Sequence, residues 1–321
     1  MTDRSLRRGD LVEVRSPGEI LASLDGQAMF AGVPFMPEMV GFCGRRFVVS
    51  ARADKMCETF RFTSVRLPDT VFLEDLRCDG SGHDGCQAEC RIFWKEAWLR
   101  RVEPSEPAMP IDADASAAAL TELARRASRV AGDNAAEADR RYRCQATEHL
   151  RASAHLRTFD PRPYVRAYTN GNVGFWHFLR VAGRAAIREP LRRLHLKGDE
   201  PVRGTRTHNK PLERLEVKPG DLVRVKTREE IAETLTTDNT DQGIWFDAEN
   251  IPYCGRTLRV RDRITRLIDE HTGKMIEPTE WITLETAKCT GDYSGGRWFC
   301  PRNFYAQWTD NWLEPIDSPG D

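Results

Sequence analysis

The sequence predicts an α+β protein in which two homologous small β-barrel domains are joined by a helical middle segment. Two observations support this prediction: a set of short β-rich segments that occurs twice, and an alanine- and arginine-rich stretch between the two copies. The 321 residues are enough for two or three domains, each with its own core. We place the first repeat at residues 1–103, the middle segment at 104–218 and the second repeat at 219–321.

The repeat is visible in five pairs of matching residues or segments. Gly-Asp-Leu-Val-Glu-Val at 9–14 is followed 211 residues later by Gly-Asp-Leu-Val-Arg-Val at 220–225. The same shift carries Cys43-Gly44-Arg45 onto Cys254-Gly255-Arg256, and Cys78 onto Cys289. The second copy then runs three residues longer, so that Cys86 matches Cys300 and Trp98-Leu99 matches Trp312-Leu313. This conserved order indicates an internal duplication.

Short β-rich runs fill each copy. The first copy has an opening strand at 11–15, a helical turn at 19–24 and further strands at 46–50, 70–74 and 92–94. The second has matching runs at 257–261, 281–284 and 304–308. This order of short strands, closed by a Trp-Leu strand, resembles an SH3-like barrel. The resemblance implies a fold and no activity.

The densest chemistry lies in residues 78–90, where Cys78, His83, Cys86 and Cys90 are interleaved with three glycines. Thiolate and imidazole are soft ligands for zinc and for iron–sulfur clusters. Glycine lets the backbone turn tightly around a bound atom. The segment therefore predicts a metal site. A glycine-rich turn with incidental buried cysteines is the alternative.

We expect three thiols to converge in each repeat. In the first repeat Cys43, Cys78 and Cys86 would bind the metal, with His83 or Cys90 as the fourth ligand. In the second, Cys254, Cys289 and Cys300 would form a related site, where Phe304 replaces Cys90. The expected cofactor is an iron–sulfur cluster, with zinc as the alternative. An equally simple alternative is that the matched cysteines are small apolar side chains buried in each core.

Cys78-Asp79-Gly80-Ser81-Gly82-His83 resembles the signature of CDGSH-type iron–sulfur proteins, which hold a two-iron cluster through three cysteines and one histidine. This sequence has one extra glycine before His83 and lacks the upstream Cys-X-Cys pair of that family. Cys86 and Cys90 lie downstream instead, which implies a different ligand order. The chain as a whole resembles uncharacterised cysteine-rich proteins from bacterial biosynthetic gene clusters, a resemblance that implies no particular activity.

Three prolines, at 104, 107 and 110, mark the start of the middle segment. We expect an alanine-rich helix from Asp114 to about Val130 and a second helix from Asp133-Asn134 through Leu156. A third helix should run from Phe175 to about Pro190, and its arginines at 184, 188, 192 and 193 make a basic amphipathic stretch. Residues 175–194 could contact a membrane surface or an acidic protein partner, although docking on neighbouring domains is the simpler explanation.

On the second of these helices, Cys144, Glu148 and His155 share one face at 3.6 residues per turn. A thiol, a carboxylate and an imidazole together suggest acid–base chemistry, so these three are our candidate catalytic residues. They could also supply a missing metal ligand. A polar helix face with a salt bridge between Glu148 and Arg151 explains the same pattern.

Several function classes lack their motifs. No dinucleotide-binding Gly-X-Gly-X-X-Gly, Walker loop or Gly-X-Ser-X-Gly is present. The formal charge of −1 and the lack of a recognition motif predict no specific binding of nucleic acid. With no signal peptide and no apolar run near 18 residues, nine cysteines suggest a cytoplasmic protein with reduced thiols.

Two hypotheses for function follow. The first is an iron–sulfur or zinc protein, with a redox or sulfur-handling role in a bacterial biosynthetic pathway and an electron donor as partner. If it is an enzyme, its chemistry depends on the metal. The second is a zinc-stabilised adaptor whose tandem barrels bind a protein partner.

Overall fold

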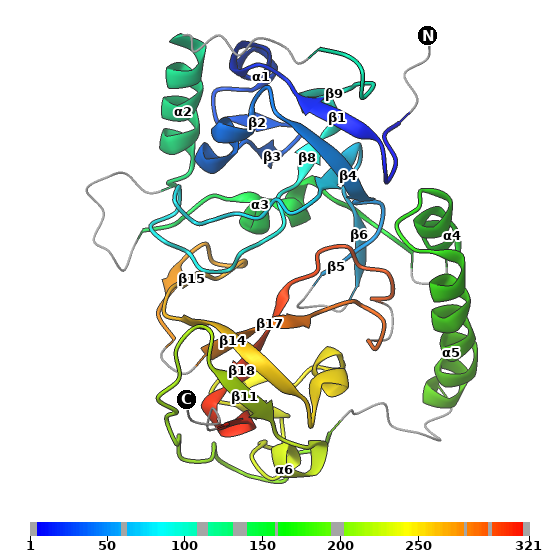
Figure 1. Cartoon of the computed structure of the whole chain (residues 1–321), viewed down its shortest axis with the longest axis vertical. Helices are drawn as coiled ribbons and strands as arrows, with labels where there is room; N and C mark the ends of the chain where they lie inside the picture. The colour runs from blue at the N-terminus through cyan, green and yellow to red at the C-terminus, as the bar shows by residue number, and fades with distance from the viewer. Residues whose placement is uncertain are drawn as a thin grey trace. The chain divides into compact units, whose positions relative to one another are not determined.

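The computed structural model describes residues 5–58, 63–107, 115–130, 140–157, 160–193, 202–278, 281–294 and 297–316. These residues form two compact units, both α+β and both built on small antiparallel sheets (Figure 1). The first unit extends to Leu179 and also includes Leu267–Ile276 and Phe299–Arg302. The second unit contains the remaining residues from Arg180 onward.

The first unit is centred on a five-stranded sheet with the order β8-β7-β4-β1-β9. Helix α2 packs against α1 and against the 3-10 helix η1 (Figure 1). The elements of this unit are β1 (Leu11–Val14), α1 (Pro17–Ser23), β2 (Met29–Phe30), β3 (Val33–Pro34), η1 (Pro37–Phe42), β4 (Arg46–Arg52), β5 (Met56–Cys57), β6 (Ser64–Arg66), β7 (Thr70–Leu73), β8 (Trp94–Lys95), η2 (Glu96–Trp98), β9 (Leu99–Arg101), α2 (Ala115–Ala127), α3 (Gln145–Ala152), β10 (Ala154–His155), α4 (Arg162–Thr169), β15 (Leu267–Ile268) and β16 (Met275–Ile276).

The second unit has a five-stranded sheet with the order β18-β17-β14-β11-β19. Helix α5 (Phe175–Arg193) crosses the boundary between the units along the chain. The other elements are β11 (Leu222–Val225), α6 (Arg228–Ala232), β12 (Thr240–Asp241), β13 (Ile244–Trp245), η4 (Ala248–Tyr253), β14 (Thr257–Ile264), β17 (Trp281–Lys288), β18 (Tyr305–Thr309), η5 (Asp310–Trp312) and β19 (Leu313–Pro315).

The two sheets pair their strands in the same register. Leu11 lies opposite Val48 in the first sheet, and Leu222 lies opposite Arg259 in the second, each residue 211 positions further on. Both sheets also have a β-bulge at the same place, between 49 and 51 in β4 and between 260 and 262 in β14. The internal duplication remains our inference, and it now rests on this shared register as well as on the sequence.

Local chemistry explains why the matching elements form. Helix α1 begins at Ser16 with a capping box in which Ser16 and Glu19 satisfy each other's backbone amides, and α6 begins with the same device at Thr227 and Glu230. Each core contains two fully buried tryptophans from the closing segment, Trp94 with Trp98 and Trp308 with Trp312. Aromatic side chains of this size dominate the apolar area that a small core can bury.

The same edge-to-face contact anchors both cores. The rings of Phe35 and Trp98 lie 5.2 Å apart at 89°, and those of Phe246 and Trp312 lie 5.2 Å apart at 88°. Such a contact places the positive edge of one ring against the negative face of the other. It fixes the closing tryptophan against the segment that leads into the 3-10 helix of each unit.

Two expectations differ from the structure, and part of a third lies outside the described residues. Among the described strands, the five-stranded sheets are open and do not close into the expected barrels. The middle segment is not a unit of its own, because residues up to Leu179 cluster with the first unit. The alanine-rich helix is present as α2, whereas its expected cap at Asp114 and the expected helix start at Asp133-Asn134 lie outside the described residues.

Candidate metal centre

Glu38 provides the first side chain of the candidate metal centre. It is the second residue of η1, which begins at Pro37, where a residue without a backbone N–H donor is well tolerated. The side chain of Glu38 is only 3% exposed. A buried carboxylate needs a compensating partner, because removing its charge from water is costly. The atoms facing Glu38 therefore decide what this position can do.

The loop after β7 supplies those facing atoms. Within it, the backbone N–H groups of His83 and Gly85 both donate to the Gly80 carbonyl, at 2.9 and 3.0 Å. Gly80 has a φ of +71°, and a Cβ atom there would lie 2.0 Å from the Cys86 carbonyl oxygen. Only glycine allows this approach. The resulting turn places the side chains of Cys78 and His83 near each other.

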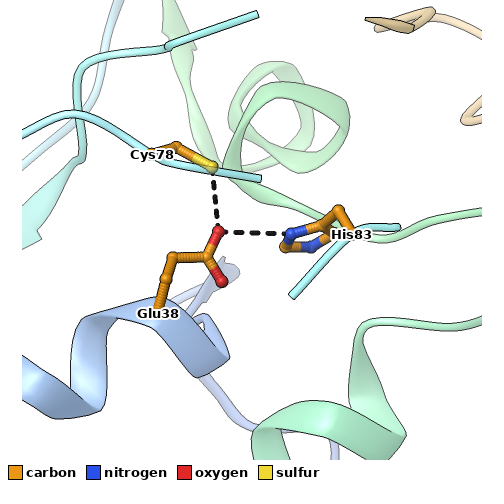
Figure 2. Close-up of side chains that lie close together, drawn as sticks. All are labelled: Glu38, Cys78 and His83. Carbon is orange, nitrogen blue, oxygen red and sulfur yellow. Dashed lines mark hydrogen bonds and ion pairs between the residues drawn. The ribbon is translucent and has the colours of Figure 1, made fainter. Parts of the chain in front are cut away.

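Cys78 and His83 both point toward one oxygen of Glu38 (Figure 2). The Cys78 thiol donates to Glu38 Oε1 over 2.8 Å, and His83 Nδ1 lies 3.2 Å from the same oxygen. The three candidate ligand atoms all lie within 4.8 Å of one another. Among the described residues, no other group of three or more Cys, His, Asp or Glu side chains has its ligand atoms this close together.

The second nitrogen of His83 determines what Nδ1 can offer. His83 Nε2 lies 3.1 Å from the Arg143 carbonyl oxygen, which can only accept, so we assign the proton of the neutral ring to Nε2. Nδ1 then carries a lone pair that faces a carboxylate oxygen. Neither Nδ1 nor Glu38 Oε2 has a hydrogen-bond partner in the described residues. Because Nδ1 lies 3.2 Å from Oε1 of the same carboxylate, a cation or an additional proton is needed between these two acceptors.

The protonation of Glu38 and Cys78 also favours a bound cation. Burial tends to raise the pKa of Glu38, but the proximity of His83 and the Cys78 hydrogen bond lower it overall. The pKa of Cys78 is raised, first by burial and then by the Glu38 charge. Without a cation Cys78 is thus a neutral thiol. A metal at this position would replace its proton, which couples metal binding to proton release.

The ligand set fits zinc. Zn²⁺ is bound by cysteine sulfur, histidine nitrogen and carboxylate oxygen, and it prefers four ligands in a tetrahedron. Histidines that bind metals commonly donate their other N–H to a backbone carbonyl, as His83 does to Arg143. Glu38, Cys78 and His83 would hold the ion and leave a fourth position. The three ligand atoms belong to the loop after β7 and to η1.

The second unit holds the equivalent carboxylate differently. Glu249 lies 211 residues after Glu38, at the same position of η4. Its carboxylate is saturated by donors from the loop that follows Cys289. Oε2 accepts from the N–H and hydroxyl of Thr290 and from the N–H of Gly291, and Oε1 accepts from the N–H of Tyr293 and from the N–H and hydroxyl of Ser294, all at 2.7–3.1 Å.

The structure does not bring the predicted cysteine triads together. Cys43 and Cys254 are the C-caps of η1 and η4, and burial raises the pKa of each thiol to about 11. Cys43 packs in the hydrophobic core of the first unit. Cys86 lies in a separate small cluster with Tyr142, where its Sγ accepts from the Ile268 N–H at 3.4 Å. Apolar packing, rather than ligation, explains these thiols.

The remaining predicted ligands are not part of the group formed by Glu38, Cys78 and His83. Cys90 and Phe304 do occupy equivalent positions, because their carbonyls accept from the N–H groups of Cys78 and Cys289, both at 2.8 Å. Burial raises the pKa of Cys90 well above its usual value. Cys300 clusters with the first unit, whereas Cys254 and Cys289 belong to the second. Among the described residues, Cys254, Cys289 and Cys300 do not form a group that meets the ligand spacing.

The predicted catalytic face is wrong. Cys144 is the N-cap residue that precedes α3, and His155 lies after the helix on the short strand β10, where it pairs with Val65. The helix ends at Ala152, because the extended backbone at Ser153 leads into that strand. Glu148 instead forms a salt bridge with Arg151 at 3.0 Å, as the simpler interpretation of the pattern predicts.

Glu38 was missed by motif reasoning because a lone glutamate in an apolar segment has no signature. A signal was nevertheless present, since the 211-residue shift also carries Glu38 onto Glu249. His83 and Cys78 were both expected as ligands, and the structure places them together.

Comparisons with protein-family models, with curated proteins and with solved structures gave no match to this chain. No helix in the described ranges combines the length and the apolar character needed to cross a bilayer.

Proposed function

We propose that Glu38, Cys78 and His83 bind a zinc ion that fastens the glycine-rich loop to η1, and that the protein is a metal-stabilised scaffold of two related α+β units. The observation that supports this is the pair of buried acceptors, His83 Nδ1 and Glu38 Oε2, which have no hydrogen-bond partner in the described residues. A cation bound by Nδ1 and by both oxygens of Glu38 would satisfy both atoms, whereas a proton on Nδ1 would satisfy that nitrogen alone.

Burial favours a structural role for this ion. The side chains of His83 and Glu38 are 1% and 3% exposed, so a ligand at the fourth position would have little access from solvent. Structural zinc sites stabilise loops that small domains cannot hold by packing alone. The related unit supports the same conclusion, because Glu249 performs the equivalent fastening with backbone N–H groups and hydroxyls.

One thiol at the centre favours zinc over a cluster. Two-iron clusters are held by four protein ligands, mostly cysteines. In the described structure no second thiol joins Cys78, Glu38 and His83 within the ligand spacing. We therefore place zinc first and retain the iron–sulfur cluster as a distinguishable outcome. The adaptor role and the SH3-like relationship of the two units are parts of the same proposal.

The test is the metal content of protein purified without oxygen, followed by zinc titration of the stripped protein against a competing chelator. We expect one zinc per chain and no acid-labile sulfide. Cys78→Ser and His83→Ala should each weaken zinc binding by more than about 100-fold, because loss of outer-shell partners alone costs about 10–100-fold. Iron with matching sulfide would overturn the zinc assignment in favour of a cluster.

Cys289→Ser is the matched control, since Cys289 is the counterpart of Cys78 in the second repeat. It should leave zinc binding unchanged. Zinc should also stabilise the wild-type protein against unfolding, by about 2.7 kcal/mol at a concentration 100 times the Kd. The Cys78→Ser variant should show no such gain. Equal zinc affinity in Cys78→Ser and wild-type protein would refute the proposal.

A further inference from the structure

A second pair of thiols lies in the first unit, away from the candidate metal centre. Cys57 ends β5, and Cys300 belongs to the Phe299–Arg302 segment that clusters with this unit. Their Sγ atoms lie 3.3 Å apart, although 243 residues separate them in the sequence. The backbone N–H of Cys57 also donates to the sulfur of Cys300, at 3.1 Å. Both residues are buried, 2% and 5% exposed.

The segment that carries Cys300 is firmly held. Phe299 is 5% exposed and stacks on Phe178, with ring centroids 5.6 Å apart and an interplanar angle of 21°. The Pro301 carbonyl accepts from Arg91 at 3.0 Å. Anchors on both sides of Cys300 therefore fix its position against β5. A disulfide has an S–S distance of about 2.05 Å, so the two sulfurs need to approach by only about 1.2 Å.

Buried cations surround this thiol pair. Arg302 is 3% exposed, and it donates to the Cys57 carbonyl at 3.4 Å and pairs with Glu270 at 2.5 Å. Lys55 is 2% exposed; its ammonium lies 4.9 Å from the Tyr164 ring centroid and interacts electrostatically with both thiols. Positive charge and hydrogen-bond donors favour the thiolate form of cysteine.

The Cys300 thiol is thus in a different state from other buried cysteines of the chain. Burial tends to raise the pKa of Cys300, but the hydrogen bond between the two thiols and those from the N–H groups of Arg302 and Cys57, together with the Arg302 charge, lower it to about 6. By contrast, burial raises the pKa of Cys144 to about 12. Burial lowers the pKa of Lys55 to about 8, which still leaves it mainly charged at pH 7.

We propose that Cys57 and Cys300 form a dithiol that a small peroxide oxidises to a disulfide. The Cys300 thiolate attacks one oxygen of hydrogen peroxide, an S–O bond forms, the O–O bond breaks, and the leaving hydroxide takes a proton to become water. The Cys57 thiol then attacks the sulfur of the Cys300 sulfenic acid. An S–S bond forms, the S–O bond breaks and a second water leaves, so that two thiols are oxidised and one peroxide is reduced.

Burial selects the oxidant. With both sulfurs almost fully enclosed, a bulky disulfide has no direct path to them, whereas hydrogen peroxide is scarcely larger than water. The oxidation is reversed by a small dithiol reductant through thiol–disulfide exchange, in which the reductant's two thiols become a disulfide and both cysteines regain their protons.

The test uses the reduced full-length protein treated with one equivalent of hydrogen peroxide. Remaining thiols are blocked by alkylation at acidic pH, and the digest is examined by mass spectrometry. We expect a linked peptide pair joined through Cys57 and Cys300, lighter by two hydrogens than the reduced peptides, and its loss after dithiothreitol. If Cys57 and Cys300 are recovered as alkylated thiols while other cysteines have been oxidised, the proposal is overturned.

Variants separate the two steps. In Cys57→Ser the reaction should stop at the Cys300 sulfenic acid, which a sulfenic-acid-selective diketone captures once the protein is denatured in its presence, while Cys300→Ser should show no such labelling at Cys57. Cys144→Ser, a buried thiol with a raised pKa, should still form the Cys57–Cys300 link. Equal diketone labelling of Cys57→Ser and Cys300→Ser would contradict the assigned roles.

Arg302 is a positioning residue in this proposal. Arg302→Met should move the pH midpoint of peroxide consumption upward, whereas Arg302→Lys, which keeps the charge, should stay closer to the wild-type midpoint. An unchanged midpoint in Arg302→Met would remove the electrostatic part of the proposal. The linked peptide in the wild-type protein tests the remainder without any substitution.

Discussion

Glu38 and Glu249 occupy the same position in the two units, yet their carboxylates are satisfied in different ways. Glu249 accepts four backbone N–H groups and two hydroxyls from the loop after Cys289. Glu38 instead faces the Cys78 thiol and the His83 imidazole. The same glutamate therefore fastens a loop by hydrogen bonds in one unit and, in our proposal, through a metal in the other.

This difference predicts unequal effects of the same substitution. Glu249→Gln should destabilise the second unit by about 3 kcal/mol without added metal, because hydrogen bonds to a charged acceptor contribute about 1.5–3 kcal/mol and the new NH₂ group faces backbone donors. Amides of residues 290–294 should exchange hydrogen faster in that variant.

Glu38→Gln is the matched variant in the first unit. Its effect should be small in metal-free protein and large when zinc is present, since its carboxylate is a proposed ligand. Unfolding in urea with and without zinc measures both. A metal-independent loss of the same size in the two variants would show that the glutamates play the same role.

Gly82 provides a second prediction. A Cβ atom at this position would lie 2.4 Å from Glu38 Oε2 and 2.9 Å from Pro37 Cγ. Gly82→Ala should therefore displace the Glu38 carboxylate and weaken zinc binding by at least about tenfold, with the far-UV spectrum unchanged. Gly41→Ala, in the same 3-10 helix but with open space around the added Cβ, should bind zinc normally. Unchanged affinity in Gly82→Ala would count against Glu38 as a ligand.

His149 predicts how stability depends on pH. Burial, helped by the charge of Arg302, lowers the pKa of His149 to about 3 from 6.5. Between these values the unfolded chain binds a proton that the folded chain does not, so stability is fully present above pH 6.5 and falls as the pH falls toward 3. The slope contributed by this residue is at most about 1.4 kcal/mol per pH unit.

The measurement is the free energy of unfolding of metal-free protein from pH 4 to 7. His149→Phe should flatten this profile, because phenylalanine carries no titrating nitrogen and preserves ring contact with Phe93. His155→Asn, at an exposed site on β10, is the control and should leave the profile unchanged. Parallel profiles for His149→Phe and wild-type protein would contradict the prediction.

Much of the fold was predictable because it depends on local pattern. The matching Gly-Asp-Leu-Val segments became β1 and β11, and the helical turn after the first of them became α1. Barrel closure was not predictable in this way, since strand lengths and edges depend on packing between distant segments. The predicted helix containing Glu148 is too long for a similar reason. The real helix ends before His155, because His155 pairs with the distant residue Val65.

The site was predictable only in part. Cys78 and His83 belong to one short loop, so their spacing carried information. Glu38 lies 40 residues before Cys78 and has no motif of its own. The pairing of Cys300 with Cys57 spans 243 residues and cuts across the repeat, so the repeat itself pointed to the wrong partners.

The assignment of Leu267–Ile276 and Phe299–Arg302 to the first unit has a consequence for synthesis on the ribosome. These segments are made long after Leu179. At about 5–20 residues per second, roughly 6–25 s pass between translation of Leu179 and of Arg302. During that interval the nascent first unit is incomplete and exposes the surfaces that these segments later cover. The contact between Cys57 and Cys300 is thus among the last that the unit can make.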